Sequence, residues 1–138
     1  MPDLLYNSFK EYACDGTIDL DSDTFKCSLF TSDHIPSASN ATFADLSGEV
    51  SGTGYTAGGA TLSNVTWTRS GATVTFDADD PSWTNATITA RYAVIYKSGT
   101  ANGIVNPLVC LLDFGADKGV TGGTFSVTFN ANGILTLS

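Results

Sequence analysis

The sequence predicts a mainly β protein, an antiparallel β-sandwich with one or two short helices in its N-terminal third. Apolar residues and threonines alternate along several segments, for example residues 65–68 and 73–76. This is the pattern of a sheet that has one face in the core and the other in water. Only 14% of the residues are charged, against about 25% in an average domain, and Thr, Ser, Gly, Ala and Asn take their place. Such a composition favours sheets with many turns.

The length of 138 residues predicts a single domain that spans residues 1–138. A domain of this size buries roughly two thirds of its unfolded surface, which is enough for a core without disulfides or metals. We expect at least seven short strands, and a jelly roll is one sandwich topology that such a number allows. No internal repeat or linker interrupts the chain.

The N-terminal segment 1–16 is expected to be helical. Its larger side chains fall near one face at helical spacing, and Gly16 is placed to end the helix. These side chains are Leu4, Leu5, Phe9, Tyr12 and Ala13. A hairpin is expected next, with residues 17–20 and 25–30 as strands around the turn 21–24.

A second short helix is predicted between Ile35 and Gly48. Ser39 or Asn40 would cap it, and Phe43 and Leu46 would pack inward.

The remainder of the chain indicates one strand after another. Residues 61–69 and 72–77 flank Ser70-Gly71, a turn typical of tight hairpins. Residues 77–85 are expected to form a loop, because Pro81 has no N–H for a sheet ladder.

Three further segments complete the predicted sheets. Residues 87–97 carry apolar side chains on both faces, which predicts the longest and most central strand. Residues 107–114 are continuously apolar and indicate a strand covered on both sides. Residues 123–138 are expected to form a closing hairpin that turns at residues 130–133, with Phe125, Val127 and Phe129 on one side.

Charge and cysteine usage exclude several function classes. The formal net charge is −8, and the cations are single rather than clustered, so no binding to nucleic acid or to an acidic membrane surface is expected. No run approaches the roughly 18 apolar residues of a membrane span, and the first residues lack the pattern of a secretory signal. Three cysteines without a C-x-x-C spacing predict neither a disulfide framework nor a zinc site.

The glycine-rich stretch from Gly48 to Gly59 has the order G-x-G-x-x-A at Gly52, Gly54 and Ala57. A dinucleotide site needs a helix directly after such a loop, and a phosphate loop needs a lysine where Ala60 stands. The residues that follow are β-branched and alternating. We therefore expect no cofactor, and we interpret the stretch as a mobile or tightly bent connection before the sheet.

Two aromatic residues are candidates for partner binding. Tyr55 lies at the centre of the glycine-rich stretch, and Trp83 follows Pro81 in the expected loop. An exposed ring in either place would stack on a sugar or insert into a neighbouring protein. The competing interpretation is that Tyr55 folds back onto the domain and that Trp83 caps an open end of the sandwich.

Catalytic and metal-binding patterns are weak. The carboxylates at 19, 21 and 23 lack the glycine and the final glutamate of an EF-hand, and those at 77, 79 and 80 allow no more than a casual calcium site. The only histidine, His34, lies in a turn-like stretch, where an exposed ring is more common than a catalytic one. We predict no catalytic residue, no metal and no enzymatic activity.

Three stretches resemble a family of small structural proteins encoded in tailed-bacteriophage genomes. They are residues 41–67, 76–98 and 108–115, and the most specific parts are Gly54–Gly59 and Trp83–Tyr92. The resemblance implies a virion-associated protein and transfers no active-site residue. Together with the small size, the acidity and the lack of a catalytic motif, this predicts a capsid decoration or cement protein, whose partners are the major capsid protein and copies of itself in a homo-oligomer. Because packaged DNA repels acidic residues, we expect it on the outer head surface.

Two other functions are weighed against decoration. One is a tail, baseplate or fibre-associated component that binds carbohydrate through Tyr55 and Trp83. The other is a small hydrolase that depends on His34.

Overall fold

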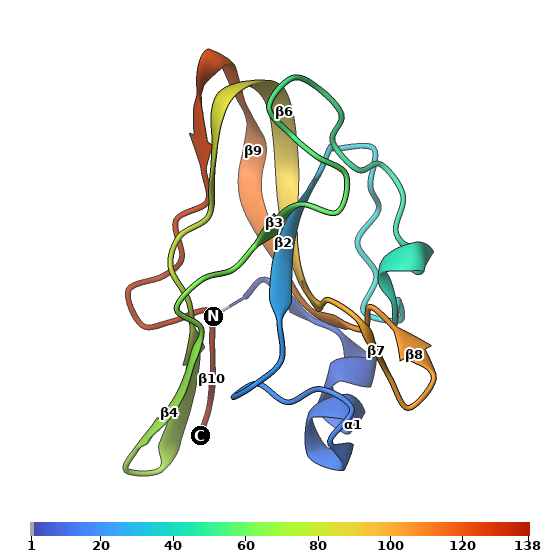
Figure 1. Ribbon diagram of the computed structural model, residues 1–138, viewed down its shortest axis with the longest axis vertical. Helices are drawn as coiled ribbons and strands as arrows, with labels where there is room; N and C mark the ends of the chain where they lie inside the picture. The colour runs from blue at the N-terminus through green and yellow to red at the C-terminus, as the bar shows by residue number, and fades with distance from the viewer. Residues whose placement is uncertain (1) are drawn as a thin grey trace.

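The computed structural model describes residues 2–138 and confirms a mainly β protein built from antiparallel sheets (Figure 1). The larger sheet contains, in spatial order, β1 (Leu4–Leu5), β9 (Leu108–Ser126), β6 (Ser82–Lys97), β2 (Phe25–Phe30) and β3 (Ala60–Thr61). The smaller sheet contains β10 (Leu135–Leu137), β5 (Thr73–Asp77) and β4 (Thr66–Ser70). A separate pair is formed by β7 (Thr100–Ala101) and β8 (Ile104–Val105). This arrangement is consistent with the predicted β-sandwich.

The long strands β6 and β9 form the backbone of the larger sheet. They pair along most of their length, and the ladder is interrupted by register shifts on either side of Ala86. Asn85 on β6 (φ 51°) and Gly122 on β9 (φ 60°) adopt left-handed conformations in this region, as is common where a strand bulges and bends. Figure 1 shows both strands curving over at one end of the molecule. The prediction of a central strand at 87–97 is confirmed, because β6 lies between β9 and β2. It is not the longest strand as predicted, since β6 has 16 residues and β9 has 19.

The core lies on both faces of the larger sheet. On one face, the rings of Phe25 and Phe76 meet edge to face with centroids 5.1 Å apart and join β2 to β5 of the smaller sheet. On the other face, Phe43 packs against Phe30 and Tyr96 with centroids 6.1 and 4.7 Å away. Coverage on both sides explains why β2, the end of β6 at Ala93–Tyr96 and the start of β9 are nearly continuous runs of buried residues.

The N-terminal segment is only partly helical. The helix α1 spans Asn7–Asp15 and ends as expected at Gly16, which has φ 86°. Leu4 and Leu5 do not extend it, because they form β1 and pair with Leu111 and Cys110 of β9. Their apolar side chains fitted a helical face equally well, but the free edge of β9 gives their backbone groups partners. Met1 lies outside the described residues.

Two other elements differ from expectation. Residues 17–20 are not a strand, because the Asp19 carbonyl accepts the Asp23 N–H at 2.9 Å and the Asp23 carboxylate accepts the Asp19 N–H at 2.8 Å, which closes a turn. The second helix is a single 3-10 turn, η1 (Phe43–Asp45), and Thr42 precedes it rather than Ser39 or Asn40. Phe43 and Leu46 do pack against the core as predicted.

The C-terminal segment pairs with a different partner. The turn at 130–133 is present, with the Gly133 N–H donating to the Asn130 carbonyl at 2.8 Å, and Phe125, Val127 and Phe129 are all buried. However, β10 pairs with β5, with Leu135 opposite Phe76, so no closing hairpin forms.

The first three strands along the chain, β1, β2 and β3, all belong to the larger sheet. This strand order does not follow the two Greek keys of a jelly roll.

Candidate functional site

The glycine-rich stretch, residues 48–59, is here called the glycine loop. Its backbone packs closely against β2 and β6. A Cβ on Gly52 would come within 2.6 Å of the Thr87 carbonyl oxygen, and a Cβ on Gly59 would overlap the Cys27 carbonyl. The loop is also tied to the sheet by backbone hydrogen bonds, from Val50 N–H to Leu29 and from Thr87 N–H to Thr53. The glycines therefore allow close backbone packing, and of the two interpretations, a mobile or a tightly bent connection, the structure fits the tightly bent one.

A partly buried hydrogen-bond network fixes the glycine loop to the sheet. The Tyr55 hydroxyl donates to Glu49 Oε2 at 2.6 Å and accepts the Leu29 N–H at 3.0 Å. The same Glu49 oxygen accepts the Gly58 N–H at 2.7 Å, and the Tyr96 hydroxyl donates to the Gly58 carbonyl at 2.6 Å. Burial raises the pKa of Tyr96 to about 12 and raises the pKa of Tyr55 well above its ordinary value. Both hydroxyls are protonated at neutral pH, as tyrosines ordinarily are, and the raised pKa values extend this state to higher pH.

The structure places both candidate partner-binding rings in the core. Tyr55 is 9% exposed and Trp83 is 7% exposed, and their ring centroids lie 5.9 Å apart. Trp83 also meets Phe125 edge to face at 6.2 Å. Residues 82–85 are not in a loop, since β6 already begins at Ser82. Neither ring is therefore an exposed anchor, and the alternative in which Tyr55 folds back onto the domain describes its position.

His34 is buried rather than exposed. Its side chain lies between the rings of Phe30 and Tyr92, with centroids 5.0 and 5.8 Å away. Its Nδ1 lies 2.9 Å from the Ser47 carbonyl oxygen, which assigns the proton to Nδ1, and the buried Nε2 has no hydrogen-bond partner. Burial lowers the pKa of His34, and the bond to Ser47 opposes this shift. The ring is thus held neutral by its surroundings.

The buried neutral His34 predicts a pH-dependent stability. Because its pKa is lower in the folded chain than in the unfolded one, the unfolded chain binds more protons as the pH falls below about 6.5. The free energy of unfolding is therefore expected to decrease with falling pH, by at most about 1.4 kcal/mol per pH unit from this group. Denaturant titrations at a series of pH values measure the slope.

The matched variant is His34→Gln, whose side-chain amide can still donate to the Ser47 carbonyl. It is expected to show a flatter profile between pH 6.5 and the onset of carboxylate protonation. Asp15, Asp19, Asp45 and Asp113 have lowered pKa values because of hydrogen bonds and titrate at lower pH. A variant slope equal to that of the wild type would contradict the assignment.

The cysteines divide into two buried thiols and an exposed one. Cys27 and Cys110 are fully buried and Cys14 is exposed. Burial raises the pKa of Cys27 to about 12 and also raises that of Cys110. We expect a thiol-specific reagent to label one site in the native protein and three after unfolding. Native labelling of more than one site, read by intact mass, would show that the sheet opens.

The aspartates of the two acidic clusters, residues 19–23 and 77–80, form hydrogen bonds and an ion pair within the chain. Asp79 accepts the Asn64 side-chain amide at 2.6 Å, and Asp80 accepts the Phe129 N–H at 2.9 Å. Asp23 pairs with Lys97 at 2.8 Å. Within residues 2–138 the structure contains no group of three or more metal-binding side chains.

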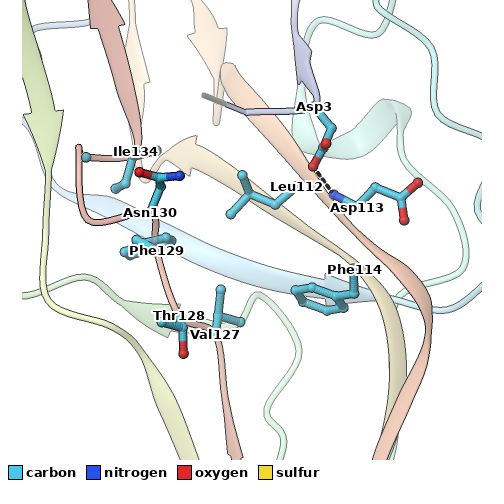
Figure 2. A pocket seen from close by; sticks show the side chains of 10 residues that line it. Asp3, Leu112, Asp113, Phe114, Val127, Thr128, Phe129, Asn130 and Ile134 are labelled. Carbon is cyan, nitrogen blue, oxygen red and sulfur yellow. Dashed lines mark hydrogen bonds between the residues drawn. The ribbon is translucent and has the colours of Figure 1, made fainter.

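A hollow of about 240 Å³ lies between the start of β9 and the segment 127–134 (Figure 2). Leu112, Phe129 and Ile134 form apolar walls, and the Asp3 carboxylate at its edge accepts the Asp113 N–H at 2.7 Å. The Asp113 carboxylate is oriented away from the hollow (Figure 2) and pairs with Arg91 at 2.7 Å. The hollow is therefore lined by both polar and apolar groups, with the Asp3 carboxylate at its edge, and its acidic side chains do not converge.

Comparison of the chain with family models, with curated proteins and with solved structures found no match in any of the three. Among residues 2–138, no helix has the length and apolar character needed to cross a membrane.

Proposed function

We propose that this chain is a structural protein of a tailed-bacteriophage particle, which attaches to the outer surface of the head and stabilises it. The observation that supports this best is the placement of its reactive groups. His34, Cys27 and Cys110 are buried in the core, and of the three thiols only that of Cys14 is exposed. Burial raises the pKa of both buried thiols and lowers that of His34, which favours the neutral form of each. What the chain offers to other molecules is sheet surface, backbone edges and carboxylates, which suits adhesion to protein.

The charge distribution favours an outer position on the head. The sequence contains 14 acidic and 6 basic residues. Arg91 and Lys97 already pair with Asp113 and Asp23, so cations are scarce on the surface while many carboxylates remain. Such a surface repels packaged DNA and is better suited to the outside of the shell. The resemblance of most of residues 5–115 to small proteins of tailed phages is the reason that the proposed particle is a tailed phage.

A decoration protein does not need a large contact on each copy. About 600–1,000 Å² per protomer is sufficient when contacts to the shell and to neighbouring copies act together. Rigid surfaces lose little freedom on attachment. The glycine loop contributes to such rigidity because Tyr55, Glu49 and Tyr96 fix it to the sheet.

The test is the copy number in purified particles. Quantitative mass spectrometry, normalised to the major capsid protein and to a tail protein of the same particle, is expected to give copies on the scale of the capsid subunits. Copies set by tail symmetry would instead support the tail alternative. Absence from the particle would overturn the proposal altogether.

The carbohydrate-binding form of the tail alternative has less support. It relied on Tyr55 and Trp83 as stacking surfaces, and the structure buries both rings. A hydrolase dependent on His34 is likewise not favoured, because its ring is packed between Phe30 and Tyr92.

A further inference from the structure

The strand β4 (Thr66–Ser70) is an edge of the smaller sheet, since β5 lies on one side of it and no strand among residues 2–138 lies on the other. The other edge strands of the larger and smaller sheets have only two or three residues. They are β1, β3 and β10. β4 has five, its pairing with β5 shows no register shift, and it contains neither proline nor glycine. Figure 1 shows the β4–β5 hairpin extending from the body at one corner. Regular edges of this kind are templates for another strand.

The hairpin geometry determines which backbone groups of β4 are free. Ser70 and Thr73 flank the two-residue turn Gly71-Ala72, in which Gly71 has φ 60°, as in a type II′ turn. The residues that flank such a turn form a hydrogen-bonded pair, and every second pair along the ladder does so too. Thr66, Thr68 and Ser70 therefore direct their N–H and C=O groups at β5. Trp67 and Arg69 direct theirs outward.

We propose that β4 pairs antiparallel with β4 of a second copy of this chain, about a two-fold axis at Thr68. In this register all five residues of the two strands overlap. Trp67, whose backbone N–H and C=O groups face outward, then lies opposite the partner's Arg69. A hydrogen-bonded antiparallel pair exchanges two N–H···O bonds, so both free residues of each copy obtain backbone partners. An isologous contact of this kind closes as a dimer and does not propagate.

The side chains fit the same register. Trp67 and Arg69 lie on one face of the strand, and Arg69 is exposed whereas Trp67 is half-buried against the core. Pairing brings each guanidinium beside the partner's indole, a favourable cation–π contact that occurs twice. On the opposite face Thr68 meets the partner's Thr68, and Thr66 meets the partner's Ser70, which are neutral hydroxyl pairs of a type common across strands. Arg69 is the only charged residue of β4. The partner's Arg69 lies diagonally across from it rather than directly opposite, so the two like charges are not paired.

This inference deepens the proposed function, in which copies of the chain lie beside one another on a shell. Its test uses purified protein, so its failure is distinct from absence of the chain in particles. Light scattering coupled to size-exclusion chromatography, over a wide range of concentrations, is expected to show a monomer–dimer equilibrium. A wild-type chain that remains monomeric throughout that range overturns the proposal.

Charge variants at the axis test the register. Thr68→Glu and Thr68→Lys each place like charges opposite each other and are expected to raise the dissociation constant of the dimer about tenfold or more. An equimolar mixture of the two variants is expected to restore the dimer, which a folding defect would not allow. Thr73→Glu, on β5 and away from the axis, is the matched control. A dimer insensitive to both Thr68 variants overturns the proposed interface.

A covalent trap tests the same axis in a weak dimer. In a Cys14→Ser background, which removes the exposed thiol, Thr68→Cys is expected to form an oxidised dimer on a non-reducing gel. Directly opposed residues of a non-hydrogen-bonded pair have Cα atoms about 4.5 Å apart, within the range that a disulfide spans. Thr73→Cys in the same background is expected to remain monomeric. Equal cross-linking of the two variants would contradict the two-fold axis at Thr68.

Discussion

Replacing Gly59 by alanine is expected to lower the free energy of unfolding by roughly 3 kcal/mol or more. Gly59 has φ 85°, where an L side chain is strained, and a Cβ there would overlap the Cys27 carbonyl of β2. The nearby atoms are backbone atoms of a central part of the larger sheet, so the clash is relieved only by moving the loop or the strand. Chemical denaturation of the wild type and the variant measures the change.

Gly16→Ala is the matched control for this experiment. Gly16 has φ 86°, nearly the same as Gly59, yet no atom lies within 4 Å of a Cβ built there. Its substitution carries the left-handed strain alone and is expected to cost about 1 kcal/mol. The difference between the two variants isolates the close approach of the glycine loop to β2. Equal losses would show that the loop does not pack against the strand in solution.

The strands that alternate cleanly were predictable from the sequence. Three strands belong to this group, namely β4, β5 and the long central strand β6. The spacing of apolar residues in each of them fits a strand and does not fit a helix. The glycine that ends α1 was equally readable, because that position needs a left-handed backbone that Gly tolerates. The β4–β5 hairpin was readable as well, but its turn is Gly71-Ala72 rather than the predicted Ser70-Gly71, because Ser70 pairs with Thr73.

Elements whose identity depends on a distant partner were not predictable. Leu4 and Leu5 fit a helix by spacing, and only the presence of β9 at their side makes them a strand. The C-terminal segment was equally able to pair with its own neighbour, and the packing of Leu135 against Phe76 decides for β5. Local patterns carry no information on such long-range choices.

The position of the candidate site residues was undetermined for a related reason. A tyrosine among glycines and a tryptophan after Pro81 both suggest exposure, since glycine and proline usually mark surface turns. Here the glycines have the opposite use, because they allow the loop backbone to approach β2 and β6 closely enough for Tyr55 to reach the core. The signal that was available is Glu49, a carboxylate in a loop with a tyrosine six residues later, but no spacing rule connects the two.

Tyr55→Phe is expected to lower the free energy of unfolding by about 1–3 kcal/mol, although it retains the ring. The hydroxyl is the partner of both the Glu49 carboxylate and the Leu29 N–H. Its removal leaves the buried Leu29 N–H without that partner, whereas the half-buried Glu49 carboxylate keeps its hydrogen bond from the Gly58 N–H. Tyr55→Ala also removes the packing against Trp83 and is expected to cost about 3–5 kcal/mol. Thermal and denaturant unfolding of both variants give the two values.

Tyr96→Phe separates the network from a general effect of losing a hydroxyl. The Tyr96 hydroxyl makes a single hydrogen bond, to the Gly58 carbonyl, so its removal is expected to cost less than that of Tyr55. The double variant Tyr55→Phe/Tyr96→Phe should lose less than the sum of the single variants, because both hydroxyls hold the same loop and its release by one substitution leaves less for the other to lose. Strict additivity would mean that the two hydroxyls act independently and would contradict a shared network.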